Sequence, residues 1–219
     1  MRVKTNFYVL TLLVMFSVLN SNLNAQNYVK LNNADAIACK NQIKKSAESV
    51  STIQCNFVQE KEMSFLDSKL ISKGKMYLKK DRKLLWQYTT PYEFSFVINE
   101  NKIAMVNKDQ KNSFDSNSNS FFKNLSSIVV GSFNGELLDN KKDFDITYFK
   151  NNNTYKVEIV PKNKVLGDMI SKISLHFNSK DWSVDSILLH DKQGDVTNID
   201  FSEKIFNKNI DNRVFDINK

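Results

Sequence analysis

Residues 73–107, KGKMYLKKDRKLLWQYTTPYEFSFVINENKIAMVN, decide the fold because their apolar side chains recur at every second position. Strand patterns of this kind cover four consecutive segments: 69–80, 82–90, 93–100 and 102–108. Only short polar turns separate the segments, and Pro91 lies in one of these turns, where it removes no hydrogen bond from a sheet. Short turns between alternating segments favour antiparallel strands that follow one another in a meander.

The rest of the chain continues the pattern on both sides of this stretch. Apolar residues at helical spacing predict a helix over 34–51, with Asn33 or Asp35 as its N-cap and with Ile37 and Ile43 on its apolar face. A second helical pattern covers 120–130. Further strands are predicted over 55–63, 143–150, 154–162, 169–178, 182–191, 195–204 and 213–218. We therefore expect one domain with about ten or eleven strands and two helical insertions.

The predicted strands carry much large apolar surface on one face. The residues that share such faces are Met76 and Leu78, then Leu84, Trp86 and Tyr88, then Phe94, Phe96 and Ile98. One helix layer cannot easily cover so much surface, so the sheet is expected to curl into a barrel or half-barrel that helices close. The alternative is that these side chains form an ordinary core.

The first residues have the layout of a secretory signal peptide. Arg2 and Lys4 precede an apolar run over 7–19, and a polar stretch follows that reaches the small residue Ala25. The run is shorter than the roughly 20 residues that a membrane span requires, although a retained signal anchor is the alternative. We expect residues 1–25 to be removed on export, most simply to a bacterial periplasm, and residues 26–219 to form the mature domain.

The charge distribution argues against nucleic-acid binding, and the positions of the two cysteines argue against a disulfide. Loss of Arg2 and Lys4 takes the formal net charge from +7 to +5, and basic and acidic residues alternate along the chain, which is typical of a solvated surface rather than of nucleic-acid binding. Cys39 lies about 18 Å along the predicted helix from its end. A disulfide requires Cα atoms within about 7 Å, so Cys39 and Cys55 are predicted to be two separate buried thiols.

Catalytic chemistry has little support in the sequence. The two histidines, His176 and His190, fall in predicted strands, and Asp191 would point to the face opposite His190. The two histidines could approach each other across a hairpin, but no cysteine or carboxylate cluster with metal-ligand spacing accompanies them. No nucleophile, phosphate or dinucleotide motif occurs. The sequence therefore predicts a binding protein that is not an enzyme and needs neither metal nor cofactor.

The order of several short motifs resembles the LolA family of periplasmic carriers of outer-membrane lipoproteins. These motifs are Phe57-Val58-Gln59 in the first strand, Gly74 to Leu78, a Trp strand that ends in a proline (Trp86 to Pro91), Asp191 to Gly194, and the ending NRVFDIN (212–218). Each motif alone is weak, but together they span nearly all of residues 32–217. The resemblance implies a mainly β (α+β) fold, an open and strongly curved antiparallel half-barrel with helices covering its concave face.

The resemblance also implies a site. It places a lipid-binding cavity at Met76, Leu78, Leu84, Trp86, Tyr88, Phe94, Phe96, Ile98 and Met105, and a lid at Phe121, Phe122, Leu125 and Ile128. Family members often carry an arginine six residues before the tryptophan, where it fastens the lid. Lys80 stands at that position here, and the nearby Arg82 could take its part.

The function implied is a monomeric periplasmic carrier that delivers acylated lipoproteins to the outer membrane. Its partners would be an inner-membrane release complex and an outer-membrane acceptor, and no nucleic acid is expected. The alternative is a protein of the same fold that binds free lipid, glycolipid or a pigment precursor, or that senses envelope lipoproteins.

Overall fold

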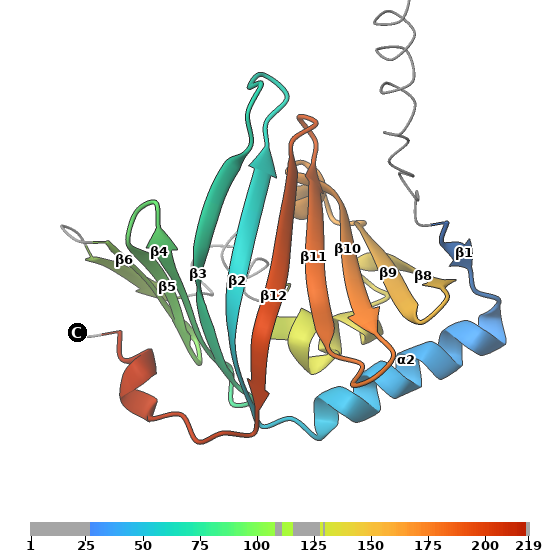
Figure 1. Cartoon of the computed structure of the whole chain (residues 1–219), viewed down its shortest axis with the longest axis horizontal. Coiled ribbons are helices and arrows are strands. Elements are labelled where there is room, and N and C mark those ends of the chain that lie inside the picture. The colour runs from blue at the N-terminus through green and yellow to red at the C-terminus, as the bar shows by residue number, and fades with distance from the viewer. Residues whose placement is uncertain (1–26, 108–110, 116–127, 129, 218–219) are drawn as a thin grey trace, which may run out of the picture.

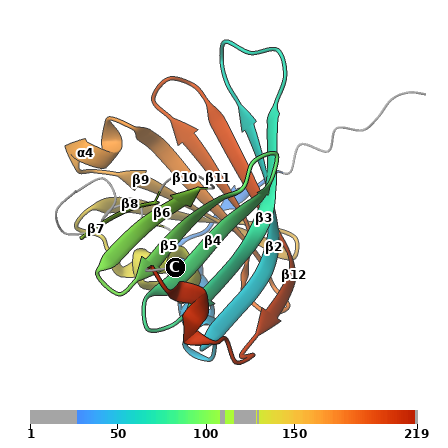
Figure 2. The ribbon, with the colours of Figure 1, turned by 90° about the vertical axis from the view of Figure 1, so that its left-hand side faces the viewer.

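A computed structural model describes residues 27–107, 111–115, 128 and 130–217. Its strands form one antiparallel sheet of twelve strands in the order β1-β8-β9-β10-β11-β12-β2-β3-β4-β5-β6-β7. β1 and β7 are the two edges, so the sheet stays open, and it is strongly curved (Figure 1; Figure 2). The predicted mainly β fold with an open, curved antiparallel sheet is confirmed.

The strands are β1 (Val29–Lys30), β2 (Thr52–Glu62), β3 (Leu70–Lys79), β4 (Lys83–Thr90), β5 (Phe94–Asn99), β6 (Lys102–Asn107), β7 (Lys111–Asp115), β8 (Phe144–Asn151), β9 (Thr154–Pro161), β10 (Ile170–Asn178), β11 (Val184–Asp191) and β12 (Val196–Phe206). The helices are α2 (Asn33–Glu48), α4 (Lys164–Gly167) and the 3-10 turns η2 (Glu136–Asp139) and η3 (Asn212–Phe215). Residues 130–134 are also helical. The predicted meander is confirmed, whereas β1 and β7 were not predicted.

Helix α2 begins one residue earlier and ends three residues sooner than predicted. Its N-cap is Asn32, whose side-chain oxygen accepts a hydrogen bond from the backbone N–H of Asp35 at 2.9 Å. Its buried face carries Cys39 and Ile43, one turn apart, while Ile37 is 61 % exposed. The prediction that Ile37 lies on the buried face is therefore wrong, because packing against the sheet, and not apolarity alone, selects the face.

The chain end does not form the predicted strand over 213–218. It turns into η3 because the side chain of Asp211 accepts a hydrogen bond from the backbone N–H of Arg213 and caps the turn. Phe215 is fully buried, and it packs with Ile210 and Ile217 against Val97 and Ala104. Those two strand residues alternate with the inward-facing ones, so the C-terminal segment covers the convex face of β5 and β6.

Both cysteines are free and buried, as predicted: Cys39 in α2 and Cys55 in β2 belong to the main core. Burial raises the pKa of the Cys39 thiol to about 11 and that of the Cys55 thiol to about 12. In the part of the chain that the structure describes, we find no helix with the length and apolarity needed to span a bilayer.

Candidate functional site

Strand register gathers the predicted cavity residues on the concave face of the sheet, where they form an inner wall. One row crosses β3 to β6 through Met76, Trp86, Phe96 and Met105. The next row crosses the same strands through Leu78, Leu84, Ile98 and Ile103. Neighbouring residues in a row are direct cross-strand partners, so their side chains make one continuous apolar surface. We use "inner wall" for these two rows together with the aromatic residues that adjoin them.

A cluster of aromatic rings adjoins the row of Met76 and Trp86 in the inner wall. Phe57 of β2 contacts the rings of Trp86 and Tyr88, with centroids 4.6 Å and 5.2 Å away. Phe201 of β12 meets Trp86 edge-on at 5.9 Å, and Tyr88 lies 6.1 Å from Phe94. Such tilted and edge-to-face pairs are favourable beyond the area that they bury. Phe57 and Phe201 were not among the predicted site residues, although Phe57 begins the motif that carried the resemblance.

Gly74 makes room for this cluster. A Cβ atom at this position would lie 2.0 Å from the backbone oxygen of Gln87 and 2.5 Å from Cζ of Phe57. The ring of Phe57 therefore occupies the space of the missing side chain, opposite Gly74 in the register of β2 and β3. Close packing against Phe57 therefore explains why a glycine stands at position 74 of this chain.

The motif Phe57-Val58-Gln59 has a second role in the same cluster. The hydroxyl of Tyr88 donates a hydrogen bond to Oε1 of Gln59 at 2.9 Å. Burial raises the pKa of Tyr88, and the nearby indole N–H of Trp86 offsets part of this shift, although its geometry falls short of a hydrogen bond. The tyrosine therefore stays a neutral donor at physiological pH.

A short helical segment lies on the inner wall, and we call its described residues, 128 and 130–139, the cover. Ile128, Val130, Phe133, Leu137 and Leu138 are buried in the same cluster as the wall residues. The rings of Phe133 and Phe201 meet edge-on, with centroids 5.1 Å apart. Figure 1 shows this segment behind the sheet, on the side opposite the viewer.

The residues that the sequence analysis assigned to a lipid-binding cavity are all buried or half-buried in this structure. Met76, Leu84 and Ile98 are fully buried, Leu78 and Trp86 are buried, and Tyr88, Phe94, Phe96 and Met105 are half-buried. In this structure the side chains of the cover are buried in the same cluster as these wall residues. Of the predicted lid residues, Ile128 is buried in the main core. Phe121, Phe122 and Leu125 lie outside the described residues.

The two predicted fastening residues take different positions. The amine of Lys80 donates to the backbone oxygen of Glu48 at 3.2 Å, so Lys80 contacts the end of α2 rather than the cover. Arg82 lines a small cavity of about 170 Å³ together with Val130 and Gly131 of the cover. Arg82 is therefore the residue of the two that adjoins the cover.

The cover is also linked to α2 through Asp139 of η2. The carboxylate of Asp139 forms ion pairs with the amines of Lys40 and Lys44, the latter at 2.5 Å. Hydrogen bonds from these two lysines lower the pKa of the Asp139 carboxyl. The side chain of Asp139 is half exposed, so solvent screens the attraction and the link is weak.

An open groove of about 620 Å³ lies between α2 and β8, which the sequence analysis did not predict. Its apolar lining comes from Ala36, Ile37, Leu138, Phe144, Ile146 and Tyr148, and its polar lining from Asn33, Lys40, Lys141, Asp145 and Lys162. The signal for it was present, because Phe144, Ile146 and Tyr148 alternate along a predicted strand. The groove adjoins the cover, since Leu138 lines the groove and belongs to the main core.

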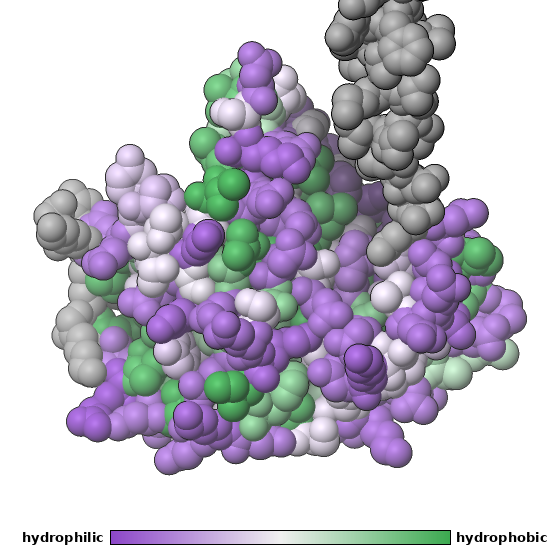
Figure 3. Space-filling model, viewed as in Figure 1, coloured by the Kyte–Doolittle hydropathy of each residue, from purple (hydrophilic) through white to green (hydrophobic). Residues whose placement is uncertain are grey.

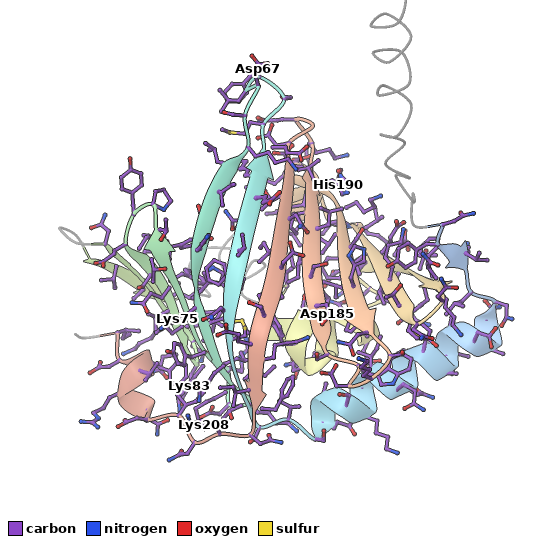
Figure 4. All side chains as sticks on the ribbon, in the orientation of Figure 1. Asp67, Lys75, Lys83, Asp185, His190 and Lys208 are labelled. Atoms are coloured by element: carbon purple, nitrogen blue, oxygen red, sulfur yellow. The ribbon has the colours of Figure 1, made fainter. Side chains whose placement is uncertain are left out.

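The convex face has a different character. Figure 3 shows mainly hydrophilic residues there, with apolar ones along the projecting β2–β3 hairpin, where Phe65 and Leu66 are exposed. Lys75 and His190 lie on this side of the sheet (Figure 4). The register pairs His176 with Ser186 and His190 with Lys172, so the two histidines are not neighbours across the hairpin. Within the described residues no group of three or more potential metal ligands occurs.

Solved structures similar to this chain include a LolA superfamily protein from Nitrosomonas europaea, with 10% identity over 81% of this chain and 97% of that one and a TM-score of 0.45. The lipoprotein LppX from Mycobacterium tuberculosis gives 10% identity, 82% and 99% coverage and a TM-score of 0.47. LprF from Mycobacterium bovis gives 8% identity, 84% and 97% coverage and a TM-score of 0.42.

No curated protein matches the sequence. The family model described as "Outer membrane lipoprotein carrier protein LolA" matches residues 48–218, which include β2 to β12, the cover and η3. Because this match extends over most of the chain, the protein belongs to the LolA family.

Proposed function

We propose that this protein is a periplasmic carrier that holds the acyl chains of lipoproteins against the inner wall and delivers them to the outer membrane. In this proposal residues 1–25 direct export and residues 26–219 act as a single monomeric domain. An inner-membrane release complex would load the carrier, and an outer-membrane acceptor would unload it. Membership of the LolA family supports the proposal.

The observation that carries the proposal is the nature of the contact between cover and wall. The wall belongs to four strands that hydrogen bonds join edge to edge, whereas the cover is one local segment that ends in a 3-10 turn. Gly135 joins the two parts of the cover with a φ of 76°, a conformation that glycine adopts without strain. The cover can therefore leave the wall without breaking any strand pairing.

Apolar chemistry explains why such a cover suits a carrier. Each methylene group of an acyl chain gains about 0.8 kcal/mol on leaving water, so a lipid anchor needs a continuous apolar surface. When no cargo is present the same surface must be shielded, and Ile128, Val130 and Phe133 shield it here. Cargo and cover thus compete for one surface, and binding shifts the population toward the open state.

Native mass spectrometry of the protein purified from its own cells tests the proposal. We expect a complex whose mass exceeds that of the mature chain by an acylated polypeptide. A complex with a small lipid alone would favour the alternative of a free-lipid binder. A protein that carries neither, and that also fails to bind acylated peptides added in detergent, would contradict both.

A matched pair of variants strengthens the test. Ile98→Ala shortens a fully buried wall residue, and Val97→Ala shortens its neighbour on the convex face. Both lose buried apolar surface, so both are expected to be less stable. Only the Ile98→Ala variant is expected to be purified with less bound cargo than the wild-type protein, because only Ile98 belongs to the inner wall.

A further inference from the structure

The indole nitrogen of Trp86 is an exception in the core. Trp86 is 6 % exposed, and its Nε1 is the one buried side-chain nitrogen or oxygen without a hydrogen-bond partner in the described part of the chain. Buried polar groups are almost always paired, because an unmade hydrogen bond keeps the full cost of desolvation. A phenylalanine here would supply an aromatic ring without that cost. The N–H of Trp86 therefore makes no hydrogen bond within the described part of the closed protein and is available to an acceptor that a ligand brings.

The surroundings of Trp86 define what this partner must be. Phe57 and Phe201 pack against the ring. The hydroxyl of Tyr88, which donates its hydrogen to Gln59, is near enough to the indole N–H for the N–H to lower the pKa of Tyr88, but the geometry of the pair falls short of a hydrogen bond. An N–H group needs an acceptor, and the acceptor must arrive from the concave side, where the cover now lies. These neighbours are uncharged, so a neutral acceptor suits the position better than a carboxylate, which would be buried without a counter-charge.

We propose that Trp86 selects the linkage of the cargo: its Nε1–H donates a hydrogen bond to the carbonyl oxygen of an ester- or amide-linked acyl chain. This inference rests on the proposed function and adds the chemical class of ligand to it. The carbonyl is the one strong acceptor that an acyl chain brings to an apolar surface. With the carbonyl fixed at Trp86, the methylene groups extend over Leu84, Ile98 and Met76, which are fully buried in the closed form.

The two tryptophans of this chain make the test direct. Trp182 lies outside the inner wall, where its ring packs on Tyr155 at 4.5 Å, so its indole resonance serves as an internal control. In a ¹⁵N-labelled protein, a diester phospholipid is expected to move the indole N–H signal of Trp86 downfield. A diether phospholipid with the same chains and head group is expected not to, because an ether oxygen is a poorer acceptor. Trp182→Phe assigns the two signals.

Affinity measurements supply a second readout. The wild-type protein is expected to bind the diester about tenfold more tightly than the diether, which is the worth of one good hydrogen bond. Trp86→Phe is expected to bind the two lipids equally, whereas Trp182→Phe keeps the wild-type ratio. If Trp86→Phe does not fold, the indole shift of the wild-type protein decides alone.

The outcomes separate this inference from the function on which it rests. Equal wild-type binding of diester and diether, with no selective shift of the Trp86 signal, would overturn the role of Trp86 and leave the carrier function standing. Failure to bind either lipid or an acylated peptide would overturn both.

Discussion

Phe133 is the side chain that best distinguishes a removable cover from an ordinary core. It is 8 % exposed and meets the ring of Phe201 at 5.1 Å. Truncation of a buried phenylalanine to alanine costs about 3–5 kcal/mol, of which an edge-to-face ring pair contributes about 0.5–1.5 kcal/mol. The cover is a short segment that can relax around the gap, so we expect Phe133→Ala to destabilise the closed form by about 3 kcal/mol, the lower end of that range.

The consequence for binding has the opposite sign. If the cover must leave the wall before cargo binds, destabilising the closed form raises the population of the binding-competent state. A tenfold change corresponds to about 1.4 kcal/mol, so Phe133→Ala is expected to bind an acyl probe up to roughly 100-fold more tightly. The same substitution in a rigid core would leave binding unchanged or weaken it.

Two titrations measure these effects together. Urea unfolding gives the loss of stability, and titration with a fluorescent acyl probe gives the affinity. Phe215→Ala is the matched control, because Phe215 is fully buried but belongs to η3, which packs on the convex face. It is expected to lose similar stability without any gain in affinity. Weaker or unchanged probe binding by Phe133→Ala would refute the reasoning.

Three further predictions follow from the packing and the charges. Gly74→Ala is expected to lower the free energy of unfolding by about 3 kcal/mol or more, because its Cβ would lie 2.0 Å from the backbone oxygen of Gln87. Gly167→Ala is the control and should change the free energy of unfolding little, because its Cβ would lie 3.9 Å from its nearest neighbour. Equal urea midpoints for the two variants would contradict this. Asp139→Asn is expected to lower stability by less than about 1 kcal/mol at neutral pH. The pKa of the Asp139 carboxyl is depressed in the folded protein, so its contribution to stability is present at pH values above the usual aspartate pKa and is lost as the pH falls through the pKa of the folded state. If the wild-type protein stayed more stable than Asp139→Asn in strong acid, the ion pairs would not be the cause. Because burial raises the pKa of Cys39 and Cys55 to about 11 and about 12, a thiol reagent at about pH 8 should label neither in the native protein and both in urea, and rapid native labelling would show that the core opens there.

The meander and its inner face could be predicted from sequence because both depend on local alternation. A two-residue period fixes which side chains share a face, and short turns fix which strands are neighbours, so Met76, Trp86 and Phe96 fall in one row as expected. The same argument indicates why Phe144, Ile146 and Tyr148 line the groove. Here alternation was visible, but the element that would lie opposite them was not.

The errors arose where a distant part of the chain decides the outcome. Val214, Phe215 and Ile217 are compatible with a strand, but the cap from Asp211 and the convex face of β5 and β6 turn the segment into η3. Apolar spacing made Ile37 part of the buried face of α2, although the sheet accepts Cys39 and Ile43 instead. Alternation alone showed only that the inner wall is apolar, and the expectation of a lid over it came from the resemblance to the LolA family.

The central claim is that acyl chains replace the cover on the inner wall. Intermolecular nuclear Overhauser effects between a deuterated, methyl-labelled protein and a protonated lipid test it most directly. We predict contacts from the lipid methylene protons to the methyl groups of Leu84 and Ile98, which are fully buried in the closed form. Contacts confined to Ile37 and Ile146 in the open groove, with Leu84 and Ile98 unchanged, would contradict the account.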